Sequence, residues 1–481
     1  MNKTAGRPGQ LIVVSNRLPV TVRPAHEATR LQNSDGGLVK ALVPILLQTG
    51  GCWVGWTGCD HDEACAASLS SLHENYSLQP VCLTAAEKAS YYNGFSNEVI
   101  WPLFHGLPSR CRFNSEYWDG YRSANRKFAD AVERVAGAGD VIWVHDYHLM
   151  LQAEILRTRQ LGSHLAYFHH IPFPAPDVFE KLPWRNEILQ ALMHFHSIGF
   201  QTSKDQNNFV ACLRRFLPWL RVSHAGNRVT VAREGLSATI GTYPISVDYE
   251  SLSAEGSESS TVGLAEMIRT KLGGTRVILG IDRLDYTKGI PERLTAFQTL
   301  LERYPELRGG VTFLQFVVPS REQIPEYQEL KLRIEILVSK INGQYSLPGW
   351  VPVHYFYRSV AHSELIALYR AADVALVTPL KDGMNLIAKE FCASRADSQG
   401  VLVLSEFAGA ADELKCGALL LNPYDAESVA SALWKAFQMS VHEQRSRMNA
   451  MRSHIRAHDV FEWARSFKIY DKLAVTEAAC G

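Results

Sequence analysis

Short, continuously apolar runs alternate with longer amphipathic stretches along most of the chain. The apolar runs are rich in β-branched residues and predict strands at Leu11–Ser15, Val141–His145, Leu165–His169, Val277–Ile281, Val311–Val318, Val374–Thr378 and Val401–Leu404. Runs of this kind are typical of parallel strands that helices cover on both faces. The amphipathic stretches predict helices, among them Ser123–Val135, Arg185–His196, Pro291–Arg303 and Ile324–Ile341. The alternation predicts an α/β protein with doubly wound sheets.

The length of the chain points to more than one core. Its 481 residues suit two or three domains of roughly 150 to 200 residues each. A polar segment of small residues, Ser253–Thr261, stands before a second series of strands and helices, so we expect a boundary between residues 240 and 260. We assign residues 1–245 to one Rossmann-like domain and residues 246–481 to another. The helical stretch after Val460 could close the second domain or cross back to the first.

Two doubly wound domains that face each other would bind ligands in an interdomain cleft. Ligands of such sheets lie at the carboxyl ends of the strands, so loops from both domains would contribute to the site.

Charge and cysteine content exclude several classes of protein. Lys plus Arg and Asp plus Glu are equal at 49 each, so a basic surface for nucleic acid is not indicated. No run reaches the roughly 18 apolar residues of a membrane span, and the first residues hold no apolar signal segment. The nine cysteines form no CxxC pair, which fits a reducing compartment. We therefore expect a cytoplasmic protein that binds neither nucleic acid nor membrane.

Two cations follow a predicted strand of the second half, in GIDRLDYTKG. Arg283 and Lys288 would lie at the carboxyl edge of the sheet, five residues apart. There they could hold a diphosphate and stabilise it as it leaves, which is electrostatic catalysis without a metal. A solvated surface pair is the alternative.

The segment TPLKDGMNLIAKE, Thr378–Glu390, combines a strand end, a turn and a helix start near Asn385. The N–H groups of the first helical turn could bind a phosphate, and Gly383 would let the backbone approach it closely. Asp382 could accept hydrogen bonds from sugar hydroxyls, and Glu390 from ribose hydroxyls. Ordinary Asp-Gly turn chemistry and a solvated glutamate are the alternative.

In the first half, Arg17 ends a predicted strand and is a candidate phosphate ligand. Gly36 and Gly37 begin a predicted helix and would let a nucleotide or sugar pass close by. Two histidine-bearing segments, His145–His148 and His169–Pro174, also end strands. Such histidines are often hydrogen-bonded structural groups, but two such segments that end at the same edge of a sheet favour a binding site.

Tyr91–His105, YYNGFSNEVIWPLFH, mixes aromatic residues with amides and hydroxyls, the usual lining of a sugar site. A packed aromatic core is the alternative. Arg321, near the end of another predicted strand, offers a second guanidinium for a phosphate.

These motifs resemble those of the trehalose-6-phosphate synthase family, retaining glucosyltransferases with two Rossmann-like domains of the type called GT-B. The resemblance runs from about Leu11 to about Phe467. It rests on VVSNRLPV, DGGLVKAL, YYNGFSNEVIWPLFH, DVIWVHDYHLM, HHIPFP, DRLDYTKGIPERL, KINGQY, VTPLKDGMNLIAKE and LSEFAGAADEL. It implies glucosyl transfer from a nucleotide sugar, UDP-glucose for preference, to glucose 6-phosphate. The product would be α,α-trehalose 6-phosphate, which serves trehalose biosynthesis and osmoprotection.

The resemblance also implies a role for individual residues. The acceptor would contact Arg17, Tyr92, Trp101, Asp146 and Arg321, with both arginines on its phosphate. The donor would contact Gly36, Gly37, Arg283, Lys288, Val360, Asp382, Gly383, Met384, Asn385, Leu386, Ile387, Ala388, Lys389 and Glu390. The residues named as catalytic are Arg283, Lys288, Asp146, His170 and Asp382, and those implied in anomer selectivity are Trp101 and Ile171.

The family retains anomeric configuration without an evident enzymic nucleophile. The resemblance implies front-face displacement, in which the leaving diphosphate helps to deprotonate the acceptor hydroxyl. We therefore name no general base, and we expect neither a cofactor nor an essential metal.

Two departures leave an alternative open. PISVD has Ser246 where the family usually has glycine, and LPWRNEIL with the double histidine is similar to the glucosylglycerol-phosphate synthases. Those use glycerol 3-phosphate as acceptor and commonly ADP-glucose as donor. A regulatory homologue without turnover is a third hypothesis. No phosphatase motif of the DxDx(T/V) kind is present, so we expect a separate downstream phosphatase, with homo-oligomerisation left open.

Overall fold

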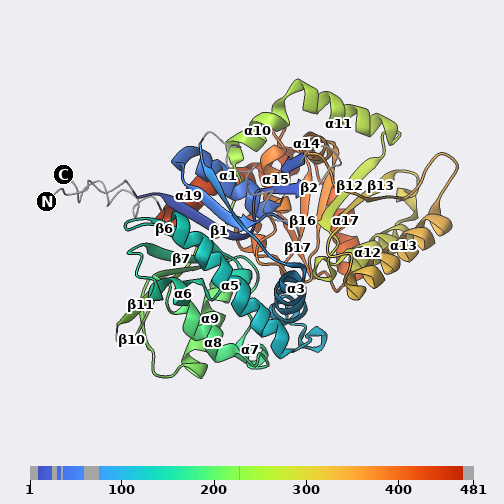
Figure 1. Ribbon diagram of the computed structural model, residues 1–481. Coiled ribbons are helices and arrows are strands. Elements are labelled where there is room, and N and C mark those ends of the chain that lie inside the picture. The colour runs from blue at the N-terminus through green and yellow to red at the C-terminus, as the bar shows by residue number, and fades with distance from the viewer. Residues whose placement is uncertain are drawn as a thin grey trace. The chain divides into compact units, whose positions relative to one another are not determined.

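The chain forms two compact units, each built around its own sheet (Figure 1). The computed structural model describes residues 9–23, 30–33, 36–58, 75–226, 228–233 and 235–469. One unit consists of the described residues up to Ile245 and those from Val460 onward, and the other of Ser246–Asp459.

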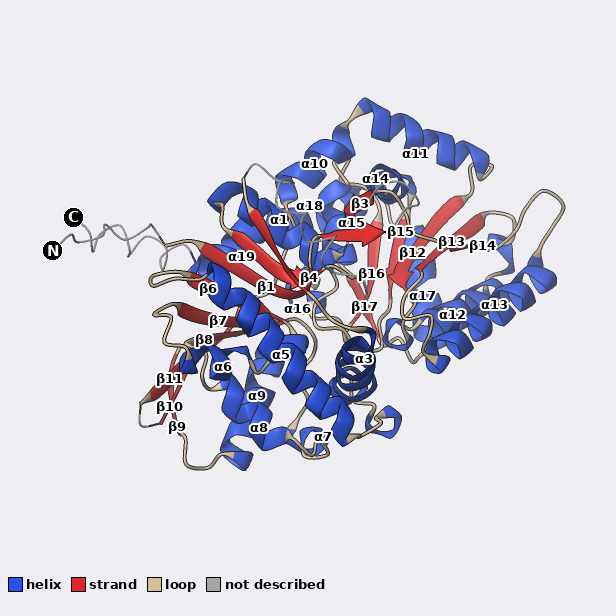
Figure 2. Cartoon of the chain, in the orientation of Figure 1, coloured by secondary structure: helices blue, strands red, loops and turns tan. Residues whose placement is uncertain are grey.

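The first unit contains a nine-stranded sheet in which the seven strands from β5 to β11 run parallel, and β10 and β9 extend the sheet beyond β11 by antiparallel pairing (Figure 2). In spatial order these are β5 (Ser77–Val81), β4 (Cys52–Trp56), β1 (Leu11–Arg17), β6 (Val141–His145), β7 (His164–His169), β8 (Ser197–Phe200), β11 (Leu236–Thr242), β10 (Arg228–Arg233) and β9 (Arg221–Ala225). A separate hairpin joins β2 (Val20–Arg23) and β3 (Arg30–Asn33).

The described helices of this unit are α1 (Gly37–Thr49), α3 (Ala85–Glu87), the π-type helix η1 (Lys88–Ile100), α4 (Trp101–Phe104), η2 (Pro108–Arg110), α5 (Ser115–Val135), η3 (Tyr147–Leu149), α6 (Gln152–Thr158), α7 (Pro176–Phe179), α8 (Arg185–Leu192), α9 (Ser203–Phe216) and α19 (Val460–Ser466). The stretch after Val460, which the sequence left open, packs on the sheet of this unit. The Trp463 ring of α19 lies 4.7 Å from Trp143 of β6 and 5.0 Å from Phe168 of β7.

The second unit contains a six-stranded parallel sheet, ordered β14 (Val353–Tyr357), β13 (Val311–Val318), β12 (Arg276–Arg283), β15 (Val374–Val377), β16 (Val401–Ser405) and β17 (Leu419–Leu421). Its described helices are α10 (Tyr249–Ser257), α11 (Ser259–Lys271), η4 (Tyr286–Lys288), α12 (Ile290–Arg303), η5 (Pro305–Leu307), α13 (Pro325–Tyr345), α14 (His362–Ala371), α15 (Leu386–Ser394), α16 (Ala410–Leu414), α17 (Ala426–Gln438) and α18 (Val441–Ala457).

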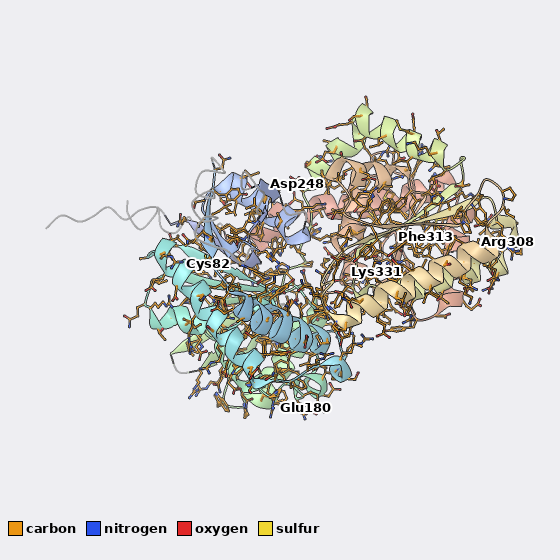
Figure 3. All side chains as sticks on the ribbon, turned by 45° about the vertical axis from the view of Figure 1, so that its right-hand side comes forward. Cys82, Glu180, Asp248, Arg308, Phe313 and Lys331 are labelled. Carbon is orange, nitrogen blue, oxygen red and sulfur yellow. The ribbon has the colours of Figure 1, made fainter. Side chains whose placement is uncertain are left out.

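The core of the second unit explains the apolar pattern of its strands. Alternate residues of the central strands, such as Phe313 and Val317 of β13, are fully buried against α12, α13 and α17. Figure 3 labels Phe313 among the side chains that fill this layer. Only every second side chain of a strand faces these helices. The strands are apolar at the other positions as well because the opposite face of the sheet is also covered.

All seven predicted strands are present, and no end differs from its prediction by more than two residues. The division between the units falls at Ile245 and Ser246, within the expected range, and the polar segment Ser253–Thr261 lies almost wholly in α10 and α11. The helix predicted over Arg185–His196 ends earlier, at Leu192, and α5 begins earlier than predicted because Asn114 caps it by accepting from Glu116 N at 2.9 Å.

The sequence analysis did not predict several of the strands. β4 (CWVGW) and β8 (SIGF) are fully or largely buried but short, and glycine interrupts each of them. Within the described ranges, no helix combines the length and the apolar character that crossing a membrane requires.

Candidate active site

Three loops meet at the carboxyl edge of the second sheet. β12 ends at Arg283 and leads to Lys288, β13 leads to Arg321, and β15 leads to Asp382. The strands β13, β12 and β15 are parallel neighbours, so these loops leave the sheet at the same edge. The sequence predictions for these four residues therefore converge on one place in the unit.

A buried carboxylate, Asp285, organises the two arginines. Its Oδ2 lies 3.1 Å from Nη1 of Arg321 and 3.7 Å from Nε of Arg283, while Oδ1 accepts from the Thr287 N–H at 3.0 Å. Burial alone raises the pKa of Asp285, but Arg321 and Arg283 outweigh it and hold the pKa below its usual value. One carboxylate thus fixes the spacing of both guanidinium groups.

Arg321 is less accessible than the sequence suggested. Its side chain is 6% exposed and is hydrogen-bonded to the Tyr327 hydroxyl as well as paired with Asp285. Its backbone takes φ 51°, a region that non-glycine residues rarely adopt. Arg283, with a side chain 43% exposed, presents the more open guanidinium.

Lys288 and Asp382 form an ion pair, with 2.5 Å between Nζ and Oδ2. The Asn385 side-chain amide donates to the same carboxylate oxygen at 3.1 Å. The two loops are also joined by their backbones, because the Leu380 N–H donates to the Thr287 carbonyl at 2.7 Å. Gly289 takes φ +64°, and a Cβ there would lie 2.3 Å from the Thr378 carbonyl oxygen, so this close approach requires glycine.

A third segment holds the Asp382 loop, and sequence reasoning missed it. The Asp382 N–H donates to the Phe407 carbonyl at 3.1 Å, and the Ala410 N–H donates to the Met384 carbonyl at 2.9 Å. A Cβ at Gly409 would lie 2.0 Å from the Gly383 carbonyl oxygen. The glycine in LSEFAGAADEL was the available signal, because a glycine beside a ligand-binding loop often permits close backbone packing.

The helix α15 begins as predicted. Asn385, at φ 95°, caps it by accepting from the Ala388 N–H at 3.3 Å. Leu386 and Ile387 are half-buried, so the first turn keeps part of its surface accessible.

The next residues of α15 point inward. Lys389 is 1% exposed and its Nζ lies 2.6 Å from Glu413 Oε2. Glu390 is 4% exposed and accepts from the Tyr369 hydroxyl at 2.8 Å. Lys389 could therefore meet a ligand only through its backbone. Val360, at 9% exposure, lies between β14 and α14.

In the first unit, Arg17 ends β1 and pairs in register with Trp56 at the end of β4. Its guanidinium carbon lies 4.0 Å above the Trp56 ring and 5.7 Å from the Tyr92 ring. The Tyr92 ring stacks in turn on His148 at 6.0 Å. Aromatic faces thus hold the Arg17 guanidinium by cation–π attraction.

The remaining acceptor candidates lie around the turn after β6. Asp146 takes φ 73°, and its Oδ1 accepts from the His170 N–H at 3.3 Å. The Trp101 ring lies 5.9 Å from Tyr147 and is 4% exposed. Ile171, which directly follows His170, is 7% exposed. The structure places Asp146 beside His170, and links Trp101 to them through Tyr147.

Gly36 and Gly37 begin α1, as predicted, with Gly36 as N-cap and Gly37 as first residue. The N-terminus of this 13-residue helix carries no side-chain cap and no acidic residue in its first turn, so its N–H groups suit an anion. Both glycines are exposed.

Three histidines at the carboxyl edge of this sheet, His145, His169 and His170, are hydrogen-bonded and have lowered pKa values. Burial lowers the pKa of His145 well below its usual value, and burial with a smaller effect of His169 lowers the pKa of His170 to about 3. His169 bonds to the Tyr167 hydroxyl at 2.9 Å, and burial lowers its pKa to about 3. In the described part of the chain, no three His, Cys, Asp or Glu side chains gather as around a metal ion.

Comparison with known proteins places the chain in a family. The profile of glycosyltransferase family 20 matches residues 9–471. The trehalose-6-phosphate synthase of Mycolicibacterium paratuberculosis is 42% identical over 473 residues, which cover 97% of this chain and 96% of that protein. The chain belongs to glycosyltransferase family 20. The resemblance drawn from the motifs is confirmed.

Solved structures agree with this assignment. A trehalose-phosphate synthase (UDP-forming) from Burkholderia xenovorans, solved with glucose-6-phosphate, has a TM-score of 0.87 and 34% identity, and covers 96% of this chain and 100% of that chain. The E. coli protein solved with UDP-2-fluoro glucose has a TM-score of 0.85 and 35% identity, and covers 97% and 99%. This family 20 glycosyltransferase therefore has the predicted GT-B class of fold, with two Rossmann-like domains.

A longer relative is also similar. The bifunctional trehalose-6-phosphate synthase/phosphatase of Thermoproteus tenax is 40% identical over 98% of this chain, which spans 64% of that protein's length.

Proposed function

We propose that this glycosyltransferase transfers glucose from UDP-glucose to glucose 6-phosphate with retention of configuration, giving α,α-trehalose 6-phosphate and UDP. Its relative from M. paratuberculosis is a trehalose-6-phosphate synthase, and similar structures were solved with glucose-6-phosphate and with UDP-2-fluoro glucose. These relatives favour glucose 6-phosphate over glycerol 3-phosphate as the acceptor.

The observation that carries the proposal is the arrangement around Asp285. One buried carboxylate holds Arg283 and Arg321 at the same sheet edge, and Lys288, on the loop that follows Arg283, pairs with Asp382. We assign Arg283 and Lys288 to the nucleotide diphosphate and Arg321, with Arg17 of the first unit, to the acceptor phosphate. Guanidinium groups suit such phosphates because they donate two parallel hydrogen bonds.

In the proposed reaction the bond between the glucosyl C1 and the diphosphate oxygen breaks while C1 bonds to the acceptor hydroxyl oxygen. The hydroxyl proton passes to the leaving diphosphate, so no enzymic base is needed. Arg283, Lys288 and the N-terminal turn of α15 stabilise the charge that develops on the diphosphate. Asp382 and His170 would orient the donor glucose, and Trp101 with Ile171 would shape the acceptor side.

The test supplies UDP-glucose or ADP-glucose with glucose 6-phosphate or glycerol 3-phosphate and follows release of the nucleotide diphosphate. We expect the highest kcat/KM for UDP-glucose with glucose 6-phosphate, and an α,α-linked product by NMR. Activity confined to glycerol 3-phosphate would favour a glucosylglycerol-phosphate synthase. Binding of UDP without turnover on all four pairs would favour a regulatory homologue.

We also propose that turnover needs no metal ion. Arg283, Lys288 and the N-terminus of α15 would supply the positive charge beside the diphosphate that other enzymes obtain from a metal cation. Dialysis against EDTA should leave kcat unchanged, and loss of activity that Mg²⁺ or Mn²⁺ restores would contradict this.

We propose further that the product is released phosphorylated, in the cytoplasm, for a separate phosphatase. The thiols of Cys111, Cys212, Cys392 and Cys416 are not in disulfides, which suits a reducing compartment. The purified protein should release no inorganic phosphate from trehalose 6-phosphate.

A further inference from the structure

A chain of hydrogen bonds runs from the backbone of Ile245, through the buried Gln201, to His170 and His145 at the carboxyl edge of the first sheet. The Ile245 N–H donates to Gln201 Oε1 at 2.9 Å. Gln201 Nε2 lies 3.4 Å from His170 Nδ1, and His170 Nε2 lies 3.0 Å from His145 Nδ1. Gln201 is 2% exposed and His145 is fully buried, and His170 between them is half-buried.

The chemistry of the groups fixes the direction of every hydrogen bond. A backbone N–H can only donate, so the Gln201 oxygen must face Ile245 and its amide nitrogen must face His170. An amide nitrogen can only donate, so His170 Nδ1 accepts and carries no proton. A neutral imidazole has one N–H, which leaves the proton of His170 on Nε2, where it donates to His145 Nδ1.

Both ring nitrogens of His170 are therefore engaged with the protein. The titratable groups around it are His145 on β6, His169 on β7 and Asp146, whose carboxylate accepts from the His170 backbone N–H. The Trp463 ring of α19 lies 6.3 Å from the His170 ring. No carboxylate of the described chain is hydrogen-bonded to the His170 ring, so nothing there stabilises an imidazolium.

We propose that Gln201 is a positioning residue that locks His170 as the neutral tautomer protonated on Nε2 and so excludes its ring from proton transfer. The ring is then uncharged where it faces the donor sugar, and two hydrogen bonds to the protein set its orientation. This matches a reaction in which the leaving diphosphate takes the acceptor's proton, and only this catalytic consequence rests on the proposed function.

The direct test is NMR of the histidine side-chain nitrogens in protein labelled with ¹⁵N-histidine, with the His170 signal assigned from the His170→Asn variant. In the wild type we expect His170 to stay neutral and protonated on Nε2 between about pH 5 and pH 8, the range in which an ordinary histidine titrates. A His170 signal that titrates in this range, or that reports protonation on Nδ1, would overturn the proposal. This measurement needs no variant of Gln201.

Two substitutions sharpen the test. In Gln201→Glu the carboxylate accepts from Ile245 and must also accept from His170, so the His170 signal should change to Nδ1 protonation or to the imidazolium. In Gln201→Met no donor remains, and the two tautomers should both be populated. Gln152→Met removes another buried amide of the same unit, which donates to the Asn125 carbonyl at 2.6 Å, and should leave the His170 signal unchanged.

Kinetics separate this inference from the proposed function. Gln201→Glu should lower kcat by about tenfold, with little change in the KM for glucose 6-phosphate, and should add a new pH dependence to kcat. An unchanged kcat and pH profile, with a changed tautomer, would show that the ring's tautomer does not matter and would overturn the catalytic part. If the wild type gave the expected NMR signal but transferred no glucose, the proposed function would be contradicted and the tautomer assignment would stand.

Discussion

The two units hold their candidate site residues in different ways. In the second unit the charged groups are paired with one another, as Asp285 contacts Arg283 and Arg321 and Asp382 contacts Lys288. In the first unit Arg17 is held by the faces of Trp56 and Tyr92. Burial lowers the pKa values of His145, His169 and His170 in the same unit, so these histidines add no positive charge near neutral pH.

This difference has an energetic consequence. A buried ion network has a fixed geometry, and removal of one member leaves other charges uncompensated. An arginine held between aromatic rings keeps its charge available and can be removed without such a penalty. We therefore expect coupled effects on stability and on both substrates in the second unit, and separable effects in the first.

The largest expected effect is that of Asp285→Asn. The substitution leaves Arg321 and Arg283 without their shared carboxylate, which should destabilise the fold by about 3–5 kcal/mol. It should also lower kcat/KM on the order of 100-fold for both substrates, because both arginines lose their position. Urea unfolding and steady-state kinetics measure the two effects. Glu427→Gln, at an exposed pair with Arg303, should cost about 0–1 kcal/mol and leave kinetics unchanged.

The same network predicts a pH dependence of stability. Because Arg321 and Arg283 hold the pKa of Asp285 lower in the folded chain, its stabilisation is complete above the unfolded value of about 3.9. It should be lost as the pH falls through the folded pKa. Urea midpoints measured down this acid range should therefore fall more steeply for the wild type than for Asp285→Asn, and parallel curves would contradict the role given to this carboxylate.

A smaller effect is expected from Gly409→Ala. The new Cβ would lie 2.0 Å from the Gly383 carbonyl oxygen, so the Asp382 loop must move. A displacement near 1 Å should lower kcat/KM for the donor by about 100-fold while the KM for the acceptor changes little. Gly263→Ala is the matched control, because nothing lies within 4 Å of its Cβ and it sits inside α11. That variant should be about 0.5–1 kcal/mol more stable and fully active.

The smallest effect concerns Arg17→Gln. Loss of one charged hydrogen-bond donor to the acceptor phosphate, worth about 1.5 kcal/mol, should raise the KM for glucose 6-phosphate by about tenfold. The donor KM and the unfolding midpoint should stay within error. Arg215→Gln, an exposed arginine of the same unit that pairs with Glu180, should change none of these values. If Arg17→Gln lowered both the stability and the affinity for the donor, the proposed difference between the two units would be contradicted.

The sequence predicted the parts of the fold that local pattern determines. Central strands such as β12 and β13 are long and apolar throughout, and the N-cap at Asn385 has a recognisable local signal. Short strands such as β4 and the π-type helix η1 depend on tertiary packing. The periodicity of apolar residues along the sequence carries no information about such packing.

The candidate site divides in the same way. Arg283, Lys288, Arg321 and Asp382 could be placed from their positions after strands. The role of Asp285 could not, because an aspartate in a turn is common and its two arginine partners lie on different loops. Likewise, the inward direction of Lys389 follows from its partner Glu413, 24 residues further along the chain, and not from the helix around it.

The central claim is that Arg283 and Lys288 bind and stabilise the nucleotide diphosphate. It is tested most directly by UDP calorimetry and steady-state turnover of Arg283→Ala and Lys288→Ala, beside Lys331→Ala on α13 as control. We predict that each site variant loses kcat/KM on the order of 100-fold and binds UDP more weakly, while Lys331→Ala matches the wild type. Wild-type turnover and wild-type UDP affinity in Arg283→Ala and Lys288→Ala would contradict the claim.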